Sequence, residues 1–269
     1  MLQLCILHYI WRYKATKQRG FYIKTIAFHL QKGGVGKTTI VGTIGNLLKK
    51  KFKVLLIDAD PQSNLSSWFF SNEANAIKFE LSDVLLNPSV LDSAILEKFG
   101  LYFLTSYGLD GGLRVFAETK LHDNPLAFMH LLEDLEKYYF DVVIFDLSPS
   151  HSRLEKAILA ACNEVITPII PEMFAVDGLA IFNSELKKIE LAYRKKIRHN
   201  RLIINAYDAR INQHKMIVEQ ADKLKYEKFV FPVDPIYRKS QALNISPVDG
   251  MKETSLDSYK LLINSLAKG

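Results

Sequence analysis

A glycine-rich stretch near the start of the chain has the residue types of a phosphate-binding loop. It reads KGGVGKTT over residues 32–39 and lies between an apolar, strand-like run and a helical pattern. Glycines at such a junction let successive backbone N–H groups turn toward a polyphosphate, and the N-terminus of the following helix adds partial positive charge. The predicted cradle consists of Gly33, Gly34, Val35 and Gly36.

The side chains that end this stretch fit the same chemistry. Lys37 would reach the terminal phosphates and the Thr38 hydroxyl would bind Mg²⁺, as a pattern ending in Gly-Lys-Ser/Thr requires. Thr39 is the next residue of the predicted site, and Gln31 stands where the pattern usually has its first glycine. The stretch therefore predicts a nucleotide phosphate site, with a glycine-rich turn that binds nothing as the alternative.

Three aspartates at the ends of apolar runs would complete such a site. Asp146 ends the run 141–146 and stands where a carboxylate would hold the Mg²⁺ shell, while Asp58 and Asp60 end the run that begins at residue 53. Phosphoryl transfer needs a positioned metal, neutralised charge and an oriented water. An aspartate after a strand is often only a turn or cap residue, but carboxyl ends of parallel strands share one sheet edge. We therefore expect the three carboxylates and the loop to meet there.

Apolar runs that alternate with helical patterns would position these residues. Continuous runs rich in β-branched and aromatic residues are typical of parallel strands covered on both faces. Strands are expected over residues 22–30, 53–58, 101–106, 141–146, 164–170 and 201–207. Helical patterns cover residues 38–51, 126–139, 179–196 and 211–225. The predicted fold class is α/β, a doubly wound and mostly parallel sheet with helices on both faces.

Length and composition bound the organisation of the chain. The 269 residues, 48% of them apolar, suffice for one sizeable core. We expect an extension over residues 1–20, too short in its apolar part to span a bilayer, and a single domain over 21–269. The first 57 residues hold 11 basic and no acidic side chains, which is compatible with an anionic partner or with a phosphate site alone. Two distant cysteines, Cys5 and Cys162, favour a reduced cytoplasmic protein.

The octapeptide K-G-G-V-G-K-T-T resembles the deviant Walker A motif of the ParA/MinD group of P-loop ATPases. This resemblance implies the P-loop NTPase fold, ATP and Mg²⁺ as cofactors, and a homodimer that sandwiches two ATP molecules. It also implies that Lys32, the signature lysine of the group, crosses the dimer to the partner's phosphates, while Lys37 serves its own nucleotide. A solvated surface lysine is the alternative for Lys32.

The resemblance implies roles for residues outside the loop as well. Asp60, in the first switch loop, would orient or activate the attacking water, and Asp58 would support the site or the Mg²⁺ shell. The amide of Asn205 would contact the adenine edge, with an ordinary turn residue as the alternative. The segment after Asp146 reads L-S-P-S, where the family usually has D-x-P-P, or D-x-P-x with a second proline or glycine nearby. Ser148 therefore departs from the family pattern, which leaves the behaviour of the second switch open.

Further segments favour the DNA-partitioning branch of the group, ParA/Soj, over its membrane-associated branch. Residues 58–64 read D-A-D-P-Q-S-N, residues 171–179 read P-E-M-F-A-V-D-G-L, and residues 207–210 read Y-D-A-R, each similar to a partition segment. A membrane-binding member needs a basic amphipathic helix at its end, whereas residues 255–269 show an ordinary core-facing stripe. A MinD-like division-site ATPase and a nonhydrolysing nucleotide-dependent scaffold are the alternatives.

Sequence-independent DNA binding would use basic side chains against phosphates. Arg210 and Arg238 match arginines of the partition family, and a basic run lies within residues 187–201. A solvated helix face is the alternative for that run, because Glu185 and Glu190 interrupt it. Its candidate residues are Lys187, Lys188, Arg194, Lys195, Lys196, Arg198 and Arg201.

The resemblance thus predicts a ParA/Soj-type partition ATPase. It implies an ATP-dependent homodimer on nonspecific DNA, slow hydrolysis stimulated by a ParB-like centromere-binding partner, and a cytoplasmic, nucleoid-associated location without membrane attachment.

Overall fold

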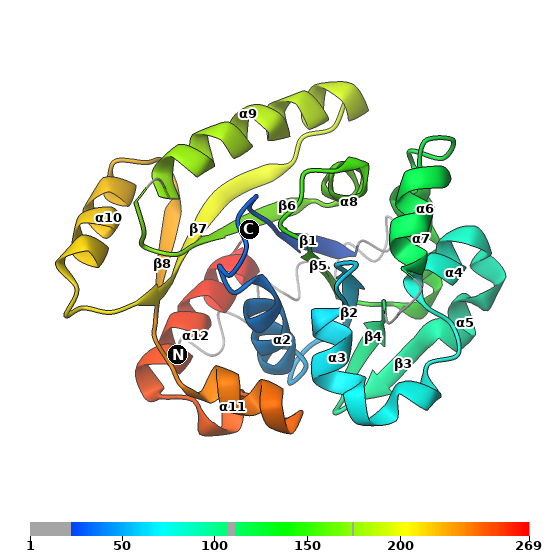
Figure 1. Cartoon of the computed structure of the whole chain (residues 1–269), viewed down its shortest axis with the longest axis horizontal. Coiled ribbons are helices and arrows are strands. Elements are labelled where there is room, and N and C mark those ends of the chain that lie inside the picture. Colours follow the sequence, from blue (N-terminus) through cyan, green and yellow to red (C-terminus); the bar gives the residue numbers. More distant parts are fainter. Residues whose placement is uncertain (1–22, 107–110, 174, 269) are drawn as a thin grey trace.

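One eight-stranded sheet, in the order β3-β4-β2-β5-β1-β6-β7-β8, forms the framework of the protein (Figure 1). The computed structural model describes residues 23–106, 111–173 and 175–268. Neighbouring strands are parallel except β3 and β4, which are antiparallel. The strands are β1 (Lys24–Phe28), β2 (Val54–Ala59), β3 (Ile95–Lys98), β4 (Leu101–Leu104), β5 (Val142–Leu147), β6 (Glu164–Ile169), β7 (Arg198–Tyr207) and β8 (Glu227–Pro232).

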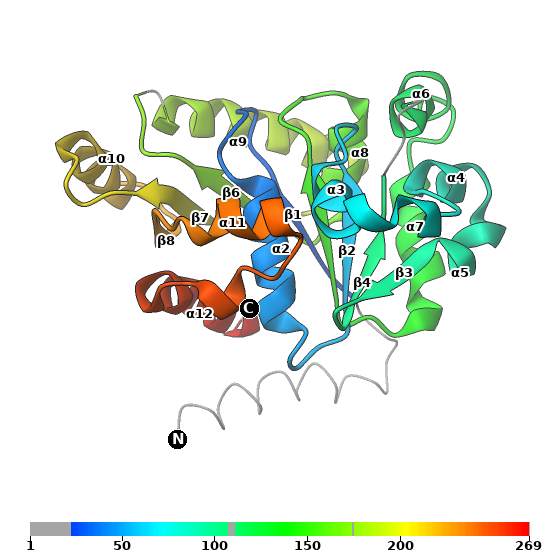
Figure 2. The ribbon, with the colours of Figure 1, turned by 60° about the horizontal axis from the view of Figure 1, so that its bottom comes forward.

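Helices cover both faces of this sheet (Figure 1, Figure 2). Apolar side chains of α7, α8 and α9 pack in one core on one face, and those of α2, α3 and α12 pack in a second core on the other. Several short 3₁₀ turns connect these elements. The helices are α2 (Lys37–Leu48), α3 (Asn64–Phe70), α4 (Leu81–Leu86), α5 (Leu91–Ala94), α6 (Gly112–Thr119), α7 (Ala127–Leu135), α8 (Arg153–Ala161), α9 (Ala175–Tyr193), α10 (Asn212–Asp222), α11 (Ile236–Leu243) and α12 (Glu253–Lys268).

The predicted fold class is confirmed. The six predicted strands correspond to β1, β2, β4, β5, β6 and β7, and the four helical patterns correspond to α2, α7, α9 and α10. Every residue of β2, β5 and β6 is buried, which explains their continuous apolar runs. The predicted extension over residues 1–20, with Cys5, lies outside the described residues, and Cys162 is buried.

The sequence pattern predicts neither edge strand, β3 nor β8. β3 is only four residues long and pairs antiparallel with β4. In β8 only Phe229 and Phe231 are buried, and the residues between and around them are half-buried or exposed. A strand with one neighbour and one partly solvated side needs no continuous apolar run, so these two segments lack the signal that marks the central strands.

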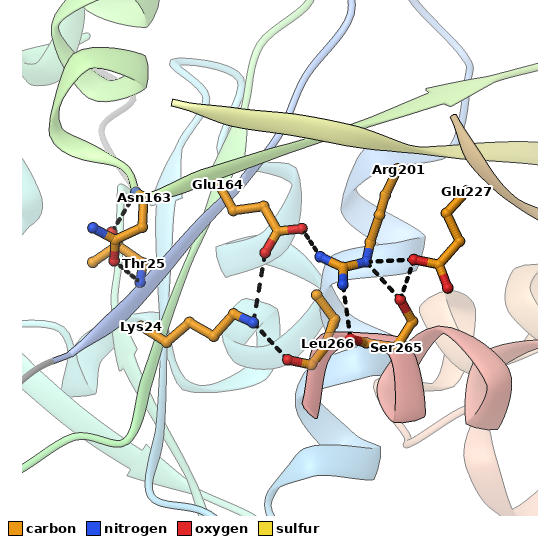
Figure 3. Close-up of polar contacts among 8 residues, drawn as sticks. All are labelled: Lys24, Thr25, Asn163, Glu164, Arg201, Glu227, Ser265 and Leu266. Atoms are coloured by element: carbon orange, nitrogen blue, oxygen red, sulfur yellow. Dashed lines mark hydrogen bonds and ion pairs between the residues drawn. The ribbon is translucent and has the colours of Figure 1, made fainter. Parts of the chain in front are cut away.

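A buried polar network fastens the last helix to the sheet (Figure 3). Arg201 on β7 is 4% exposed and ion-paired with Glu164 on β6. Its guanidinium also donates to the side chain and to the carbonyl of Ser265 on α12, both at 2.7 Å. Lys24 on β1 lies 3.5 Å from Glu164 and donates to another main-chain carbonyl of α12 at 2.7 Å. Arg201 is thus enclosed, and the prediction that it contacts DNA is wrong.

Candidate functional site

Residues 32–39 form a tight loop after β1 and the first residues of α2, at the carboxyl edge of the sheet. Gly36 directly precedes α2 with φ 89°, and Gly34 has φ 73°, so both adopt the left-handed region that favours glycine. A Cβ atom at Gly36 would lie 2.3 Å from Nδ2 of Asn205. That amide donates to the carbonyl of Val35 at 2.9 Å. Asn205 therefore supports the loop from behind, and a larger side chain at Gly36 would displace this support.

The side chain of Lys37 turns back into the loop. It is 7% exposed, and Nζ donates to the carbonyls of Lys32 and Leu30 at 3.2 and 3.5 Å. Burial lowers the pKa of Lys37, whereas the carboxylates of Asp146 and Asp60 raise it. A bound polyphosphate would give this ammonium a charged partner in place of loop carbonyls, which is the stronger type of hydrogen bond. Its position therefore suits the terminal phosphates of a nucleotide.

Asp146 is a fully buried carboxylate with open coordination. It is the register partner of Asp58 on the neighbouring strand, and neither of its oxygens has a hydrogen-bond partner within 3.5 Å among the described residues, although the Thr38 hydroxyl lies near enough to stabilise its charge. Burial raises the pKa of Asp146 well above its ordinary value, the Asp58 charge raises it further, and the Thr38 hydroxyl and Lys37 ammonium oppose the shift. A buried, unpaired carboxylate is costly, and a divalent cation beside it would remove that cost.

The residues present fit Mg²⁺ as part of a nucleotide complex. Mg²⁺ keeps several waters and typically takes one or two protein oxygens together with phosphate oxygens. In the described part of the chain, no three or more His, Cys, Asp or Glu side chains cluster closely enough to hold a metal by themselves. The open carboxylate of Asp146 and the hydroxyl of Thr38 are the donors suited to that partial coordination.

Asp58 and Asp60 organise the loop that follows β2. The Asp58 carboxylate accepts hydrogen bonds from the N–H and hydroxyl of Ser66, at 2.8 and 2.7 Å, and from the Asp60 N–H at 3.2 Å. Burial raises the pKa of Asp58 to about 7. Asp60 is 5% exposed, accepts from the N–H of Gln62 at 2.9 Å and lines the cavity described below. Burial also raises the pKa of Asp60, against the opposing effects of the Gln62 N–H and Lys37.

A cavity of about 950 Å³ opens over the phosphate loop. Its floor is the loop from Gly33 to Thr39, and Asp60 and Pro149 lie on its wall. Sequence reasoning missed the outer wall, which α3 and α11 build. There Gln241 Nε2 donates to the Thr39 hydroxyl at 3.1 Å across 202 positions of sequence. The other residues of this wall include Ser67, Trp68, Ser71, Asn72, Ala242, Leu243 and Asn244. The sequence held one signal for this wall: the segment R-K-S-Q-A over residues 238–242, which resembles the partition family at Arg238, includes the wall residues Gln241 and Ala242.

Lys32 and Asn205 lie outside the set of described residues that line the cavity. Lys32 Nζ is ion-paired with Glu172 Oε2 at 2.6 Å, and the two side chains are 36% and 56% exposed. The predicted trans contact of Lys32 and the predicted adenine contact of Asn205 stay predictions.

The predicted DNA-contact residues differ in their availability. Lys195 is half-buried and donates to the carbonyl of Ala161 at 2.6 Å, and Arg201 is enclosed as described above. Arg210 is 89% exposed, although ion-paired with Asp208 at 2.6 Å. The exposed members of the set are Lys187, Lys188, Arg194, Lys196, Arg198, Arg210 and Arg238.

Comparison with known proteins agrees with this geometry. A family model described as an AAA domain matches residues 23–199, more than half of the chain. The chain belongs to this family. The chromosome-partitioning ATPase Soj of Treponema pallidum is 28% identical to this AAA-domain protein over 239 residues, which are 87% of this chain and 90% of Soj. The uncharacterized protein BBD21 of Borreliella burgdorferi is 34% identical over 233 residues, or 86% and 94% of the two chains.

A solved structure extends the similarity to the whole fold of this AAA-domain protein. A plasmid partition protein of Borrelia burgdorferi B31, BB_S35, was crystallised bound to AMPPNP. Its structure matches with a TM-score of 0.79 and 26% identity, covering 92% of this chain and 100% of that one. The predicted resemblance to ParA/Soj partition ATPases is confirmed, and with it the P-loop NTPase fold.

Proposed function

We propose that this protein is an ATP-dependent DNA partition ATPase. ATP closes a homodimer, the dimer binds DNA without sequence preference, and hydrolysis stimulated by a ParB-like partner releases it. The observation that carries the proposal is the open, buried carboxylate of Asp146 beside the inward-turned Lys37, because phosphoryl transfer on a Mg²⁺-nucleotide needs both charges at one place. The similarity to Soj and to a plasmid partition protein supports DNA as the partner, and with it an association with the nucleoid.

Each residue of the site has its own proposed task. The loop N–H groups and Lys37 bind the phosphates, and Thr38 with Asp146 would hold Mg²⁺ and its waters, which neutralise phosphate charge. Asp60, at the cavity wall, orients the attacking water. Asp58 acts indirectly, because it holds Asp60 and α3 in place: it accepts from the N–H of Asp60 and from the N–H and hydroxyl of Ser66 in the first turn of α3.

Lys32 is proposed to reach the nucleotide of the partner subunit. The side chain lies on the outer side of its loop, where Glu172 pairs with it. An exposed ion pair contributes only about 0.2–1 kcal/mol, whereas a hydrogen bond between charged groups in a closed interface is considerably stronger. Exchange of Glu172 for a phosphate of the partner's nucleotide is therefore favourable when the dimer closes.

The packing of the last helix argues against the membrane-associated alternative. The α12 side chains of Tyr259, Leu262 and Leu266 are at most 7% exposed and belong to the core under the sheet. An amphipathic helix binds a membrane through the same kind of apolar stripe, and here the protein itself covers it. In the described residues, no helix has both the length and the apolarity that a bilayer crossing requires.

Retention on nonspecific DNA tests the proposal. The protein is applied to immobilised DNA of random sequence in ATP with Mg²⁺, in ADP with Mg²⁺ or without nucleotide, at increasing salt. We expect retention in ATP only, with a steep decline as salt rises. Lys37→Ala and Lys32→Ala should abolish it, whereas Lys120→Ala, an exposed lysine after α6, should not. Retention that ignores the nucleotide, or that survives Lys37→Ala, would contradict the proposed cycle. Phosphate release by wild type separates the ATPase from a nonhydrolysing scaffold.

A further inference from the structure

A single buried carboxylate, that of Glu155, closes the loop that follows β5. Glu155 lies in the first turn of α8 and is 1% exposed. One of its oxygens accepts from the N–H and hydroxyl of Ser152, at 2.9 and 2.5 Å, which caps the helix. The other oxygen accepts from the hydroxyl of Ser148 at 2.5 Å. The carboxylate therefore joins the first and last residues of the loop 148–152.

This loop borders the proposed reaction site. Pro149 lines the cavity over the phosphate loop, and Ser148 comes two residues after Asp146. Ser148 is 7% exposed, and its oxygen also accepts from the N–H of Ser150 at 3.1 Å. The outer side of the loop is held by His151, whose Nε2 lies 2.9 Å from the Glu185 carboxylate on α9.

Helix capping alone does not account for these contacts. A capping box needs only the N-cap residue and the carboxylate three positions later, here Ser152 and Glu155. The hydrogen bond from Ser148 is additional. It connects the second oxygen of Glu155 to the end of the loop that lies two residues from Asp146. Glu155 thus accepts three hydrogen bonds from the two ends of the loop, which are the contacts of a residue that holds the loop in place.

We propose that Glu155 and Ser148 are positioning residues of the ATPase site, whose hydrogen bond fixes the loop 148–152 and its Pro149 against the phosphate end of the cavity. This inference rests on the proposed ATPase function. A displacement of about 1 Å near reacting groups can reduce a rate about a hundredfold. Loss of the bond should therefore act on turnover more than on nucleotide binding, which the loop 32–39 provides.

Two serine variants separate positioning from capping. Ser148→Ala and Ser152→Ala each remove one hydroxyl from the same carboxylate, at opposite ends of the loop. We expect Ser148→Ala to lower kcat for ATP about tenfold or more, with the affinity for a nonhydrolysable ATP analogue within about twofold of wild type. Ser152→Ala should instead lower Tm by a few degrees, with kcat close to wild type at 20 °C. Glu155→Gln should show both effects. An unchanged kcat in Ser148→Ala would overturn the inference.

Hydrogen exchange of the nucleotide-free protein provides a readout without turnover. The amides of residues 148–152 should exchange faster in Ser148→Ala than in wild type, while those of the loop 32–39 stay the same. Equal exchange of residues 148–152 in the two proteins would contradict the fixation of the loop. An inactive wild type would refute the ATPase function itself, whereas an active wild type with an equally active Ser148→Ala would refute only the positioning role.

Discussion

Replacing Asp146 with asparagine would separate two effects of this carboxylate: its destabilisation of the folded protein and its contribution to binding of the Mg²⁺-nucleotide complex. Asp146 is fully buried, has no hydrogen-bond partner for either oxygen within the described residues, and has Asp58 as its register partner. Asparagine keeps the shape of the side chain and removes its charge. We expect Asp146→Asn to be more stable than wild type without nucleotide at pH 8, and to bind no Mg²⁺-nucleotide complex.

The expected magnitudes follow from the burial of this group. An unsatisfied buried polar group costs about 1–3 kcal/mol, and a charged one more. Asparagine is still an unpaired polar group at this position and removes only the additional cost of the charge. In a chain of this size, each kcal/mol changes Tm by about 2–4 °C, so the nucleotide-free variant should melt a few degrees above wild type. A ligand at a hundred times its Kd stabilises the protein that binds it by about 2.7 kcal/mol. Saturating ligand should therefore remove much or all of the advantage of the variant.

Thermal unfolding followed by circular dichroism measures both effects. Each protein is melted at pH 8 in EDTA, and again with excess Mg²⁺ and a nonhydrolysable ATP analogue. Asp134→Asn, at an exposed position on α7, is the matched control and should stay within about 0.5 kcal/mol of wild type in both conditions. An Asp146→Asn protein that melts below wild type in EDTA would refute the reasoning about the buried charge. If Mg²⁺ and the ATP analogue raise the Tm of Asp146→Asn as much as they raise that of wild type, the proposed role of Asp146 at Mg²⁺ is refuted.

Three further predictions concern other charged groups. The pKa of Asp58 is about 7 in the folded protein against an ordinary 3.8, so the folded state holds this proton more tightly. Relative to Asp58→Asn, which does not titrate there, nucleotide-free wild type should therefore lose stability as pH rises from about 4 to 7. The comparison cancels the opposite pH dependence of the buried His29 and His199, whose pKa values burial lowers. A stability difference in urea denaturation that does not change with pH would contradict this. Glu172→Gln removes the ion pair that Lys32 must break in each subunit before it can reach the partner's nucleotide. Two such pairs at about 0.2–1 kcal/mol each predict that the ATP-dependent dimer of the variant is about two- to thirtyfold tighter, as measured by analytical ultracentrifugation. A weaker dimer would exclude competition between Glu172 and phosphate for Lys32. Arg201→Ala leaves the buried Glu164 with only Lys24, at 3.5 Å, as a charged partner, and should lower the free energy of unfolding in urea by about 3–5 kcal/mol. The double variant Arg201→Met with Glu164→Gln should recover most of this loss. A loss below about 1 kcal/mol would show that the network contributes little.

The sequence by itself determined the central strands and the phosphate loop, because both depend on residues close together in the chain. The buried strands appear as continuous apolar runs, and residues 32–39 hold the three glycines, two lysines and two threonines of the phosphate site in one segment. The ends of parallel strands share an edge, so the approach of Asp58 and Asp146 also followed from local pattern. The pairing of Ser152 with Glu155 is likewise visible as S-x-x-E.

Only the tertiary structure decided the contacts that depend on which helix packs over which part of the sheet. Arg201 is one more basic residue in a basic run until α12 and the neighbouring strands enclose it. Gln241 reaches Thr39 because α11 folds over the start of α2. Local propensity and periodicity carry no information about such approaches, since the free energy that selects them comes from burying apolar faces between elements far apart in the chain.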